Sequence, residues 1–429
     1  MSPAVLSIII LVVCVVLFVT EWLPLITTAV LGATAMAVFG ILTFSQAFGG
    51  FASDTVFLVV GMVTLGNAMF ATGAAQLLGK AIIKVAGNNE RVILAISMTA
   101  AAAISAFLSN TATVAMFMAI FTGLTATNRD LKYKNLVMPV ALAAVAGGVC
   151  TLVGSTPQVV AQGLLINSLG KGFEFFDFAW VGVPICVVMV LFFVTIGYNV
   201  GKKIWGDRYD EGMAEVPVSE ETEEKKPEVN NTKVIISLVI FVLTITAFVT
   251  KVFDAIGLTC MVAALLCVIT RCISQKEAIE QMDWVSVGVL GGALGLAEGL
   301  AVSGGGKMIA DAFINLVGID ASAFVIFAAI MFITVVLTQF MSNTASVAML
   351  VPISIFICQD MGYNPYAFAM GIIVAANMSF STPVATTPLT MTLKAGYRFM
   401  DYVKMGGVFN IIAYFLVIIL TPISFPLLL

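Results

Sequence analysis

Long apolar segments follow one another from the start of this chain to its end, and they limit its fold more than any other feature. Of its 429 residues, 60% are hydrophobic and only 10% are charged. A water-soluble domain of this length needs more charge on its surface, whereas about 20 consecutive apolar residues cross about 30 Å of hydrocarbon. The sequence therefore predicts an all-α integral membrane protein with lipid around most of the chain. We expect the first segment, 4–20, to be a span, because it lacks the basic flank and cleavage site of a signal peptide.

Ten of these segments are predicted to cross the membrane. They are 4–20, 24–43, 55–75, 135–165, 177–199, 233–252, 256–271, 285–303, 364–392 and 405–427. Two further apolar stretches, 92–125 and 322–358, are interrupted at their centres by polar residues. The one long hydrophilic segment, 200–232, is acidic, and its composition predicts a solvated linker.

The basic residues predict the orientation, since loops rich in lysine and arginine stay in the cytoplasm. We take the first span to run inwards and each interrupted stretch to return to the side that it entered. Of the 20 basic residues, 17 then lie in the cytoplasm, and the three outside are Lys171, Lys251 and Lys307. The linker is thus predicted to be cytoplasmic and both termini external, in the inner (plasma) membrane of a bacterium.

The two halves of the chain carry matching motifs about 231 residues apart. Ser109-Asn110-Thr111 recurs as Ser342-Asn343-Thr344, and Gly154-Ser155-Thr156-Pro157 has a counterpart in Ala385-Thr386-Thr387-Pro388. A period this long indicates a duplicated half rather than a solenoid. Each half holds five spans, an odd number, so the second must be inverted relative to the first, as in many transporters.

The predicted organisation is two inverted five-span repeats, 1–199 and 233–429, joined by the cytoplasmic acidic linker 200–232. The first repeat contains scaffold spans within 4–75, a re-entrant hairpin at 92–125, a broken helix at 135–165 and a span at 177–199. The second contains scaffold spans within 233–303, a hairpin at 322–358, a broken helix at 364–392 and a span at 405–427.

Polar residues at the centre of an apolar stretch need a partner, because an unpaired polar group in hydrocarbon is costly. A re-entrant hairpin tip or a broken helix would present such groups to a ligand: helix N-termini favour an anion, and free carbonyl oxygens favour sodium. Two ordinary spans joined by a polar turn would be the alternative. Two matching motifs, each paired with a Thr-Pro break, favour the binding site.

These motifs resemble those of the divalent-anion/sodium symporters of the ion transporter superfamily, which include dicarboxylate, citrate and sulfate carriers. The Ser-Asn-Thr pair stands at 109–111 and 342–344, and the stretches around Gly154 and Pro383-Val384-Ala385 are similar to the other family motifs. The resemblance covers nearly the whole chain. It implies a homodimer that carries a small anionic substrate with sodium by an elevator mechanism.

The resemblance also implies the binding residues. One sodium ion would be held by Ser105, Ser109, Asn110 and the backbone at Gly154, and the other by Thr338, Ser342, Asn343 and the backbone at Ala385. The substrate would contact Asn110, Thr111, Ser155, Asn343, Thr344 and Thr387. Ser105 and Thr338 each precede a motif serine by four residues, so on one helix they would face the same ion.

The chain departs from the family pattern in two places. It lacks the extra span that usually precedes the first repeat. The second proline and the asparagine of each Pro-Pro-Asn are replaced, giving Pro157-Gln158 and Pro388-Leu389. The ion sites keep their residues, so the substituted positions bear on substrate preference.

Glu298 lies within span 285–303, where an ionisable group is usually functional; its repeat counterpart is Asn67. The helix belongs to the family's scaffold, so we expect a structural partner or a near-interface position for Glu298 rather than an ion ligand.

Other functions fit the residues less well. A sodium/proton antiporter needs a titratable carboxylate at the crossing point, and both motifs contain only neutral residues. A sodium-independent anion exchanger would use a fixed positive charge, and Lys394 is the lysine nearest in sequence to a motif. The chain has no histidine and its seven cysteines are scattered, which disfavours an enzyme, a zinc site and a disulfide framework. We therefore expect sodium ions but no cofactor, and no nucleic-acid partner.

Overall fold

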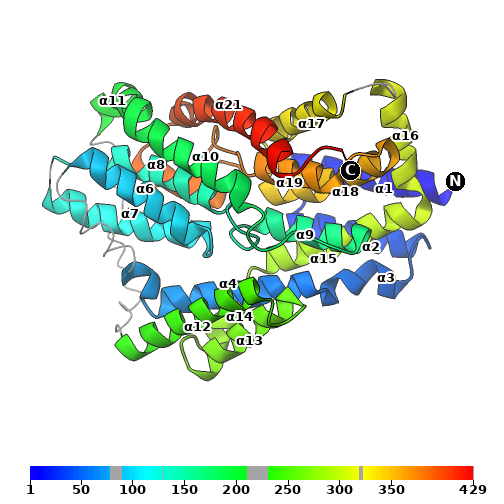
Figure 1. The fold of residues 1–429 in the computed structure, drawn as a ribbon, viewed down its shortest axis with the longest axis horizontal. Coiled ribbons are helices and arrows are strands. Elements are labelled where there is room, and N and C mark those ends of the chain that lie inside the picture. Colours follow the sequence, from blue (N-terminus) through cyan, green and yellow to red (C-terminus); the bar gives the residue numbers. More distant parts are fainter. Residues whose placement is uncertain (78–88, 129, 210–229, 318–321, 429) are drawn as a thin grey trace.

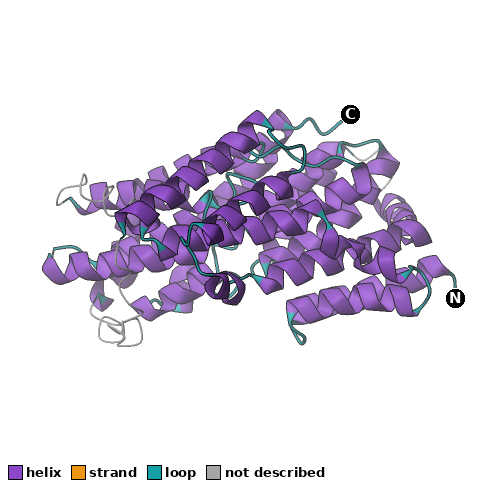
Figure 2. Cartoon of the chain, turned by 90° about the horizontal axis from the view of Figure 1, so that it is seen from below, coloured by secondary structure: helices purple, strands orange, loops and turns teal. Residues whose placement is uncertain are grey.

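The computed structural model describes residues 1–77, 89–128, 130–209, 230–317 and 322–428, and over these ranges the chain is a bundle of helices without a strand (Figure 1, Figure 2). One isolated bridge joins Tyr363 to Leu428. Among the described residues, eight helices are long and apolar enough to cross a membrane, and shorter apolar helices accompany them. The predicted all-helical membrane fold is confirmed at this level.

The first part of the chain forms these elements in order. They are α1 (Pro3–Thr20), α2 (Leu25–Val38), α3 (Phe44–Phe48), η1 (Gly49–Ala52), α4 (Asp54–Ala71), α6 (Glu90–Ser105), α7 (Asn110–Thr127), α8 (Tyr133–Gly147), α9 (Thr156–Leu169), α10 (Ala179–Phe192), the π-helix η2 (Phe193–Gly197), α11 (Tyr198–Trp205) and η3 (Gly206–Arg208).

The second part repeats the succession of long and short helices. Its elements are α12 (Asn231–Thr250), α13 (Ile256–Ile269), α14 (Gln275–Glu280), α15 (Trp284–Ser303), α16 (Gly305–Val317), α17 (Ala323–Leu337), α18 (Asn343–Met361), α19 (Pro365–Ala376), α20 (Thr387–Thr392), η5 (Leu393–Ala395) and α21 (Phe399–Ser424).

Four interruptions of the helices stand at the polar motifs. Residues 106–109 separate α6 from α7, and residues 338–342 separate α17 from α18. Residues 148–155 separate α8 from α9, and residues 377–386 separate α19 from α20. The motif serines start the helices that follow: Ser109 Oγ accepts the Ala112 N–H at 3.4 Å and Ser342 Oγ accepts the Ala345 N–H at 3.2 Å. The chain therefore leaves its helices at the stretches where a ligand site was expected.

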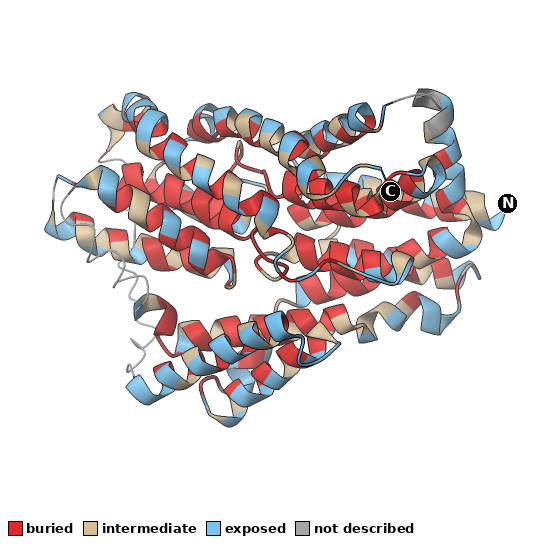
Figure 3. Cartoon of the chain, in the orientation of Figure 1, coloured by how far each residue is buried: buried red, intermediate tan, exposed pale blue. Residues whose placement is uncertain are grey.

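The two parts of the chain pack against each other by corresponding helices. Helix α4 packs on α13 and α2 packs on α15, and these four helices are related in pairs by the offset between the motifs. The buried residues concentrate in the middle of the molecule (Figure 3). Every residue of α8 is buried, as is nearly all of α19, so the first parts of the two broken helices form the core beside the motifs.

Helical structure continues past the boundary at which the linker was predicted to begin. Residues 198–208 form α11 and η3 and pack against the bundle. Trp205 is buried and its indole N–H donates to Asn135 Oδ1 at 3.0 Å, while Arg208 pairs with Asp401 at 2.9 Å. Residues 210–229 of the predicted linker lie outside the described residues.

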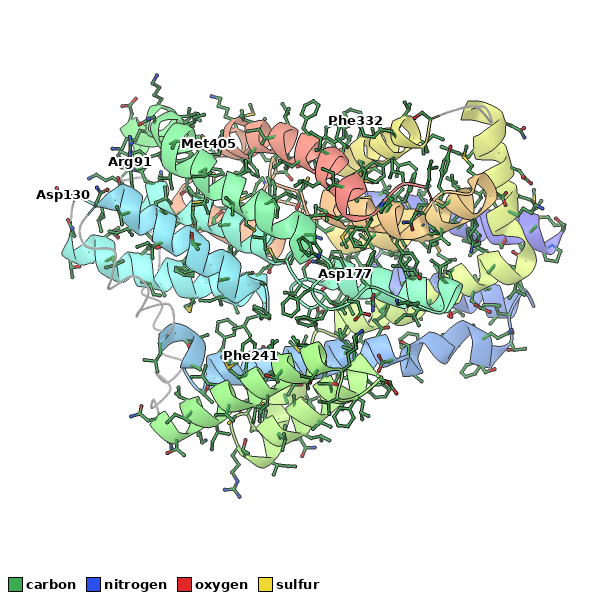
Figure 4. All side chains as sticks on the ribbon, viewed as in Figure 1. Arg91, Asp130, Asp177, Phe241, Phe332 and Met405 are labelled. Atoms are coloured by element: carbon green, nitrogen blue, oxygen red, sulfur yellow. The ribbon has the colours of Figure 1, made fainter. Side chains whose placement is uncertain are left out.

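Both termini lie at the same end of the molecule, whereas α11, which leads into the linker, lies at the opposite end (Figure 1). Helices α4, α12 and α13 lie together along one edge. Phe241 of α12 reaches from that edge to Phe107 between α6 and α7, with ring centroids 5.7 Å apart (Figure 4).

Candidate functional site

A cavity of about 590 Å³ lies where the interrupted helices meet. It is lined by residues from both halves of the chain, including the tips between α6 and α7 and between α17 and α18. The predicted site residues that line it are Ser109, Asn110, Thr111, Gly154, Ser155, Ser342, Asn343, Thr344, Ala385 and Thr387. The structure thus brings together polar residues that are more than 200 positions apart in the sequence.

Ser105 and Thr338 do not line the cavity but lie directly behind it. Ser105 Oγ donates to Asn110 Oδ1 at 2.5 Å, and Thr338 Oγ1 lies 2.8 Å from Asn343 Oδ1. Both hydroxyl residues are fully buried. The argument from one helical turn does not apply, because α6 ends at Ser105 and α17 ends at Leu337. The contact that the structure makes is to the motif asparagine, and it is the same in both halves.

The backbone around Gly148 and Gly154 comes unusually close to the first motif. A β-carbon on Gly154 would lie 2.3 Å from the Gly148 carbonyl oxygen, and one on Gly148 would lie 2.6 Å from Asn110 Oδ1. Larger residues cannot occupy these positions without moving the backbone. The close approach places main-chain carbonyls beside the Asn110 amide oxygen, and oxygens of this kind suit a hard cation such as sodium.

Each hairpin tip is tied to the neighbouring break by a threonine. Thr151 donates its hydroxyl to the Ala106 carbonyl, and Thr382 donates to the Gln339 carbonyl at 2.8 Å. Gln339 adds a bond from its amide to the Met378 carbonyl at 2.8 Å. The two threonine bonds correspond by the repeat offset, so both breaks are fixed to their hairpins in the same manner.

The breaks of the two halves also contact each other directly. Ser155 Oγ lies 2.9 Å from Asn377 Oδ1 and 2.5 Å from Gln158 Oε1, and Gln158 Nε2 donates to the Gly148 carbonyl at 2.6 Å. A hydroxyl has one proton, so Ser155 donates to one of its two neighbours at a time. Gln158, which replaces the family's asparagine, therefore helps to hold the first break in place.

Sequence reasoning missed Asn377 and Thr386. Asn377 ends α19 and lines the cavity. Thr386 also lines it, and its buried Oγ1 has no hydrogen-bond partner among the described residues. A buried hydroxyl without a partner is costly and available to a ligand. The doubled threonine of Thr386-Thr387 was the available signal, but only the second threonine was assigned to the substrate.

The described residues that line the cavity include no lysine or arginine, and one carboxylate, that of Asp283. Asp283 Oδ1 accepts the Ser286 N–H at 3.0 Å, which starts α15, and its other oxygen accepts the Ser286 hydroxyl. Ser286 Oγ lies 2.9 Å from Thr156 Oγ1 on α9. An anion in this cavity would meet helix N-termini, hydroxyls and amides, together with any cation bound beside it.

Glu298 does not line the cavity. It is half-buried on α15, and Asn167 Nδ2 of α9 donates to its Oε2 at 3.1 Å. Its repeat counterpart, Asn67, does line the cavity and donates to the Gln281 carbonyl at 3.1 Å. Lys394 is exposed in η5 and is not among the lining residues.

Comparison with known proteins was made once this geometry was established. A model of the citrate transporter family matches residues 15–369 and 322–429. An uncharacterized transporter of Haemophilus influenzae is 28% identical over 428 residues, which cover 92% of this chain and 87% of that protein. The sodium-dependent dicarboxylate transporter SdcS of Staphylococcus aureus is 25% identical over 446 residues, covering 96% and 84%. The resemblance read from the motifs is confirmed by these matches.

Two solved structures share the fold. MtrF of Neisseria gonorrhoeae, described as illuminating a class of antimetabolite efflux pumps, superposes with a TM-score of 0.64 at 14% identity, covering 99% of this chain and 95% of MtrF. The YdaH transporter of Alcanivorax borkumensis superposes with a TM-score of 0.58 at 11% identity, covering 99% and 98%. At these identities the likeness concerns the fold alone.

Proposed function

Because the chain belongs to the citrate transporter family, we propose that it is a secondary transporter that carries a small di- or trivalent anion across a bacterial plasma membrane together with sodium. Its relatives and structural neighbours are transporters rather than enzymes. The dicarboxylate and sodium named for SdcS are the starting point for substrate and coupling ion here.

The matched contacts Ser105–Asn110 and Thr338–Asn343 carry this proposal. Each places a hydroxyl oxygen and an amide oxygen within 2.8 Å of each other behind the cavity. Neutral oxygens at this spacing are the ligands that sodium prefers. Since no basic side chain lines the described cavity, bound sodium is the available source of positive charge for a carboxylate or sulfate substrate.

Corresponding contacts in the two halves support inverted repeats. Gly61 packs on Cys260 and Gly292 on Ala29, and both members of one pair are related to the other pair by 231 residues. The Thr151 and Thr382 anchors follow the same relation. Contacts exchanged in this way between two halves are what a two-fold relation produces.

An elevator mechanism would move the hairpins and broken helices against α1–α4 and α12–α15. Three printed polar contacts cross this boundary: Thr156–Ser286 at 2.9 Å, Asn167–Glu298 at 3.1 Å and Glu174–Lys251 at 2.9 Å. Few such bonds would have to break when one group slides past the other. We further propose that the protein is a homodimer with a cytoplasmic linker and external termini.

Sodium/proton antiport is the second candidate, and the Asp283 carboxylate in the cavity favours it. Antiport requires a group there that takes up and releases a proton. Asp283 already caps α15, which gives it a structural role. Asp283→Asn keeps a side-chain acceptor for the cap, so this variant should retain sodium-driven uptake if the protein is a symporter.

Uptake by proteoliposomes tests the proposal. An inward sodium gradient, with no anion inside, should drive accumulation of at least one radiolabelled anion among succinate, citrate and sulfate. Uptake that requires internal anion and ignores sodium would identify an exchanger, and Lys394→Gln would then abolish it. Sodium flux driven by a pH gradient without any anion would instead identify an antiporter.

A further inference from the structure

A second cavity, of about 550 Å³, lies at the ends of α4, α12 and α13 and at the start of α14. It is separate from the motif cavity and shares no lining residue with it. Its lining residues are Ala71, Thr72, Asn230, Lys233, Val268, Arg271, Cys272, Ile273, Ser274, Gln275 and Glu277. The cavity adjoins the end of the linker, which precedes Asn230.

Two cationic side chains, Lys233 and Arg271, face this cavity. Neither forms an ion pair within 4 Å among the described residues. The one carboxylate in the lining, Glu277, is occupied: its Oε2 accepts the Ser274 N–H at 2.9 Å. Hydrogen bonds from the Ser274 side chain and backbone lower the pKa of Glu277. The lining is therefore net positive, with both cations available to a ligand.

The turn that carries Arg271 does not need an arginine. Arg271 has a left-handed backbone with φ +58°, and the residue 231 positions earlier, Gly40, makes the equivalent turn with φ +71°. Glycine is the residue that such a conformation favours. The same offset relates the capping boxes Thr43–Gln46 and Ser274–Glu277, so the two turns share their construction. A strained arginine in place of glycine indicates that its charge is used.

The surface beside this cavity is apolar and outward-facing. On α12, Ile235 is 61% exposed, and Val239 continues the exposed row. On α13, Ile269 is 73% exposed, and Leu265 lies one turn before it. Exposed apolar rows on membrane-spanning helices face lipid tails, so the cavity stands where this lipid-facing surface ends in polar residues.

We propose that this cavity binds the phosphate group of an anionic phospholipid. Lys233 and Arg271 would contact the phosphate oxygens, and the acyl chains would lie along the exposed rows of α12 and α13. Basic pockets between membrane helices bind lipid headgroups in this way. The apolar rows favour a lipid over a free phosphate ion, because a free ion gains nothing from them. The proposal does not depend on which solute the protein transports.

Thermal unfolding of delipidated protein in detergent, titrated with phosphatidylglycerol, tests the site. Arg271→Gly is the informative variant: it restores the residue found at the repeat-related turn, so without lipid it should be at least as stable as the wild type. Removing one charge should raise the phosphatidylglycerol concentration for half-maximal stabilisation about fivefold. Lys233→Gln should act similarly.

Lys276→Gln is the matched control, since Lys276 stands on α14, pairs with Glu280 at 3.8 Å and does not line the cavity. It should respond to phosphatidylglycerol like the wild type. The proposal is overturned if Arg271→Gly and Lys233→Gln also keep the wild-type response. It is equally overturned if inorganic phosphate stabilises the protein at the same concentrations as the lipid, or if phosphatidylcholine replaces phosphatidylglycerol fully.

Discussion

Gly61 of α4 lies so close to Cys260 of α13 that a β-carbon on the glycine would stand 2.4 Å from the Cys260 carbonyl carbon. The same contact occurs between Gly292 of α15 and the backbone of Ala29 of α2, at 2.5 Å. The two glycines are 231 residues apart, and so are Ala29 and Cys260. Each half of the chain therefore supplies the glycine of one contact and its partner in the other.

Gly61→Ala and Gly292→Ala should both destabilise the protein. The added methyl group forces two helices apart, and overpacking of this kind costs about 1–3 kcal/mol. Gly66→Ala on the same helix as Gly61 is the control: its nearest neighbour would be 3.8 Å away, and alanine favours a helix over glycine by about 0.5–1 kcal/mol. Thermal unfolding in detergent measures all three. If Gly61→Ala unfolds no earlier than Gly66→Ala, the close contact does not limit stability.

Asn110→Ala and Asn343→Ala should abolish anion uptake while leaving folded protein in the membrane. Each asparagine is expected to serve both an ion and the substrate, and hydrogen bonds to charged groups contribute about 1.5–3 kcal/mol. Residual binding should need at least about tenfold more sodium. Asn199→Ala, an exposed asparagine bonded to Arg91, should transport normally. Robust uptake by both cavity variants would remove the proposed site.

The sequence was sufficient to predict the membrane fold and where the helices break, because hydrophobic runs and polar interruptions are local signals. It could not predict partners that depend on how distant segments cross. Asn377 contacts Ser155 only because the two breaks meet, and no repeat motif marks it. Trp205 likewise lies in a segment whose charge suggested a solvated linker, yet it is buried against Asn135.

Thr382→Val should weaken sodium binding without removing a predicted ion ligand. The threonine ties Gln339, which follows Thr338 directly, to the second break by a 2.8 Å bond, and losing one such bond costs about 1 kcal/mol. Sodium dependence of uptake should shift by about fivefold. Thr246→Val is the control, since Thr246 is exposed on α12 and bonds only the Val242 carbonyl of its own helix. An unchanged sodium dependence in Thr382→Val would show that the anchor does not position the ion site.

Glu298→Gln should lower the amount of protein or the transport rate and leave the sodium dependence unchanged. Glu298 bonds Asn167 across the boundary between α15 and α9 and does not line the motif cavity. Glutamine keeps an oxygen acceptor for Asn167, so the effect should be smaller than that of Glu298→Ala. Uptake measured at several sodium concentrations distinguishes the two roles. A shift of the sodium curve in Glu298→Gln would instead make the carboxylate part of the ion pathway.

Cysteine labelling from outside intact cells should locate both termini outside and the linker inside. The seven native cysteines are all buried, so an impermeant thiol reagent should react little with the unmodified chain. New cysteines at Ser2 and Leu429 should react, whereas one at Glu221 should react only after the cells are opened. The physical reason is that 17 of the 20 basic residues fall on the linker side of the predicted topology, and such loops are retained in the cytoplasm. The structure places the termini at one end and α11 at the other, so all three labels answer the same question (Figure 1). Labelling at Glu221 in intact cells, with protection at Ser2, would reverse the orientation and put the proposed lipid site in the outer leaflet.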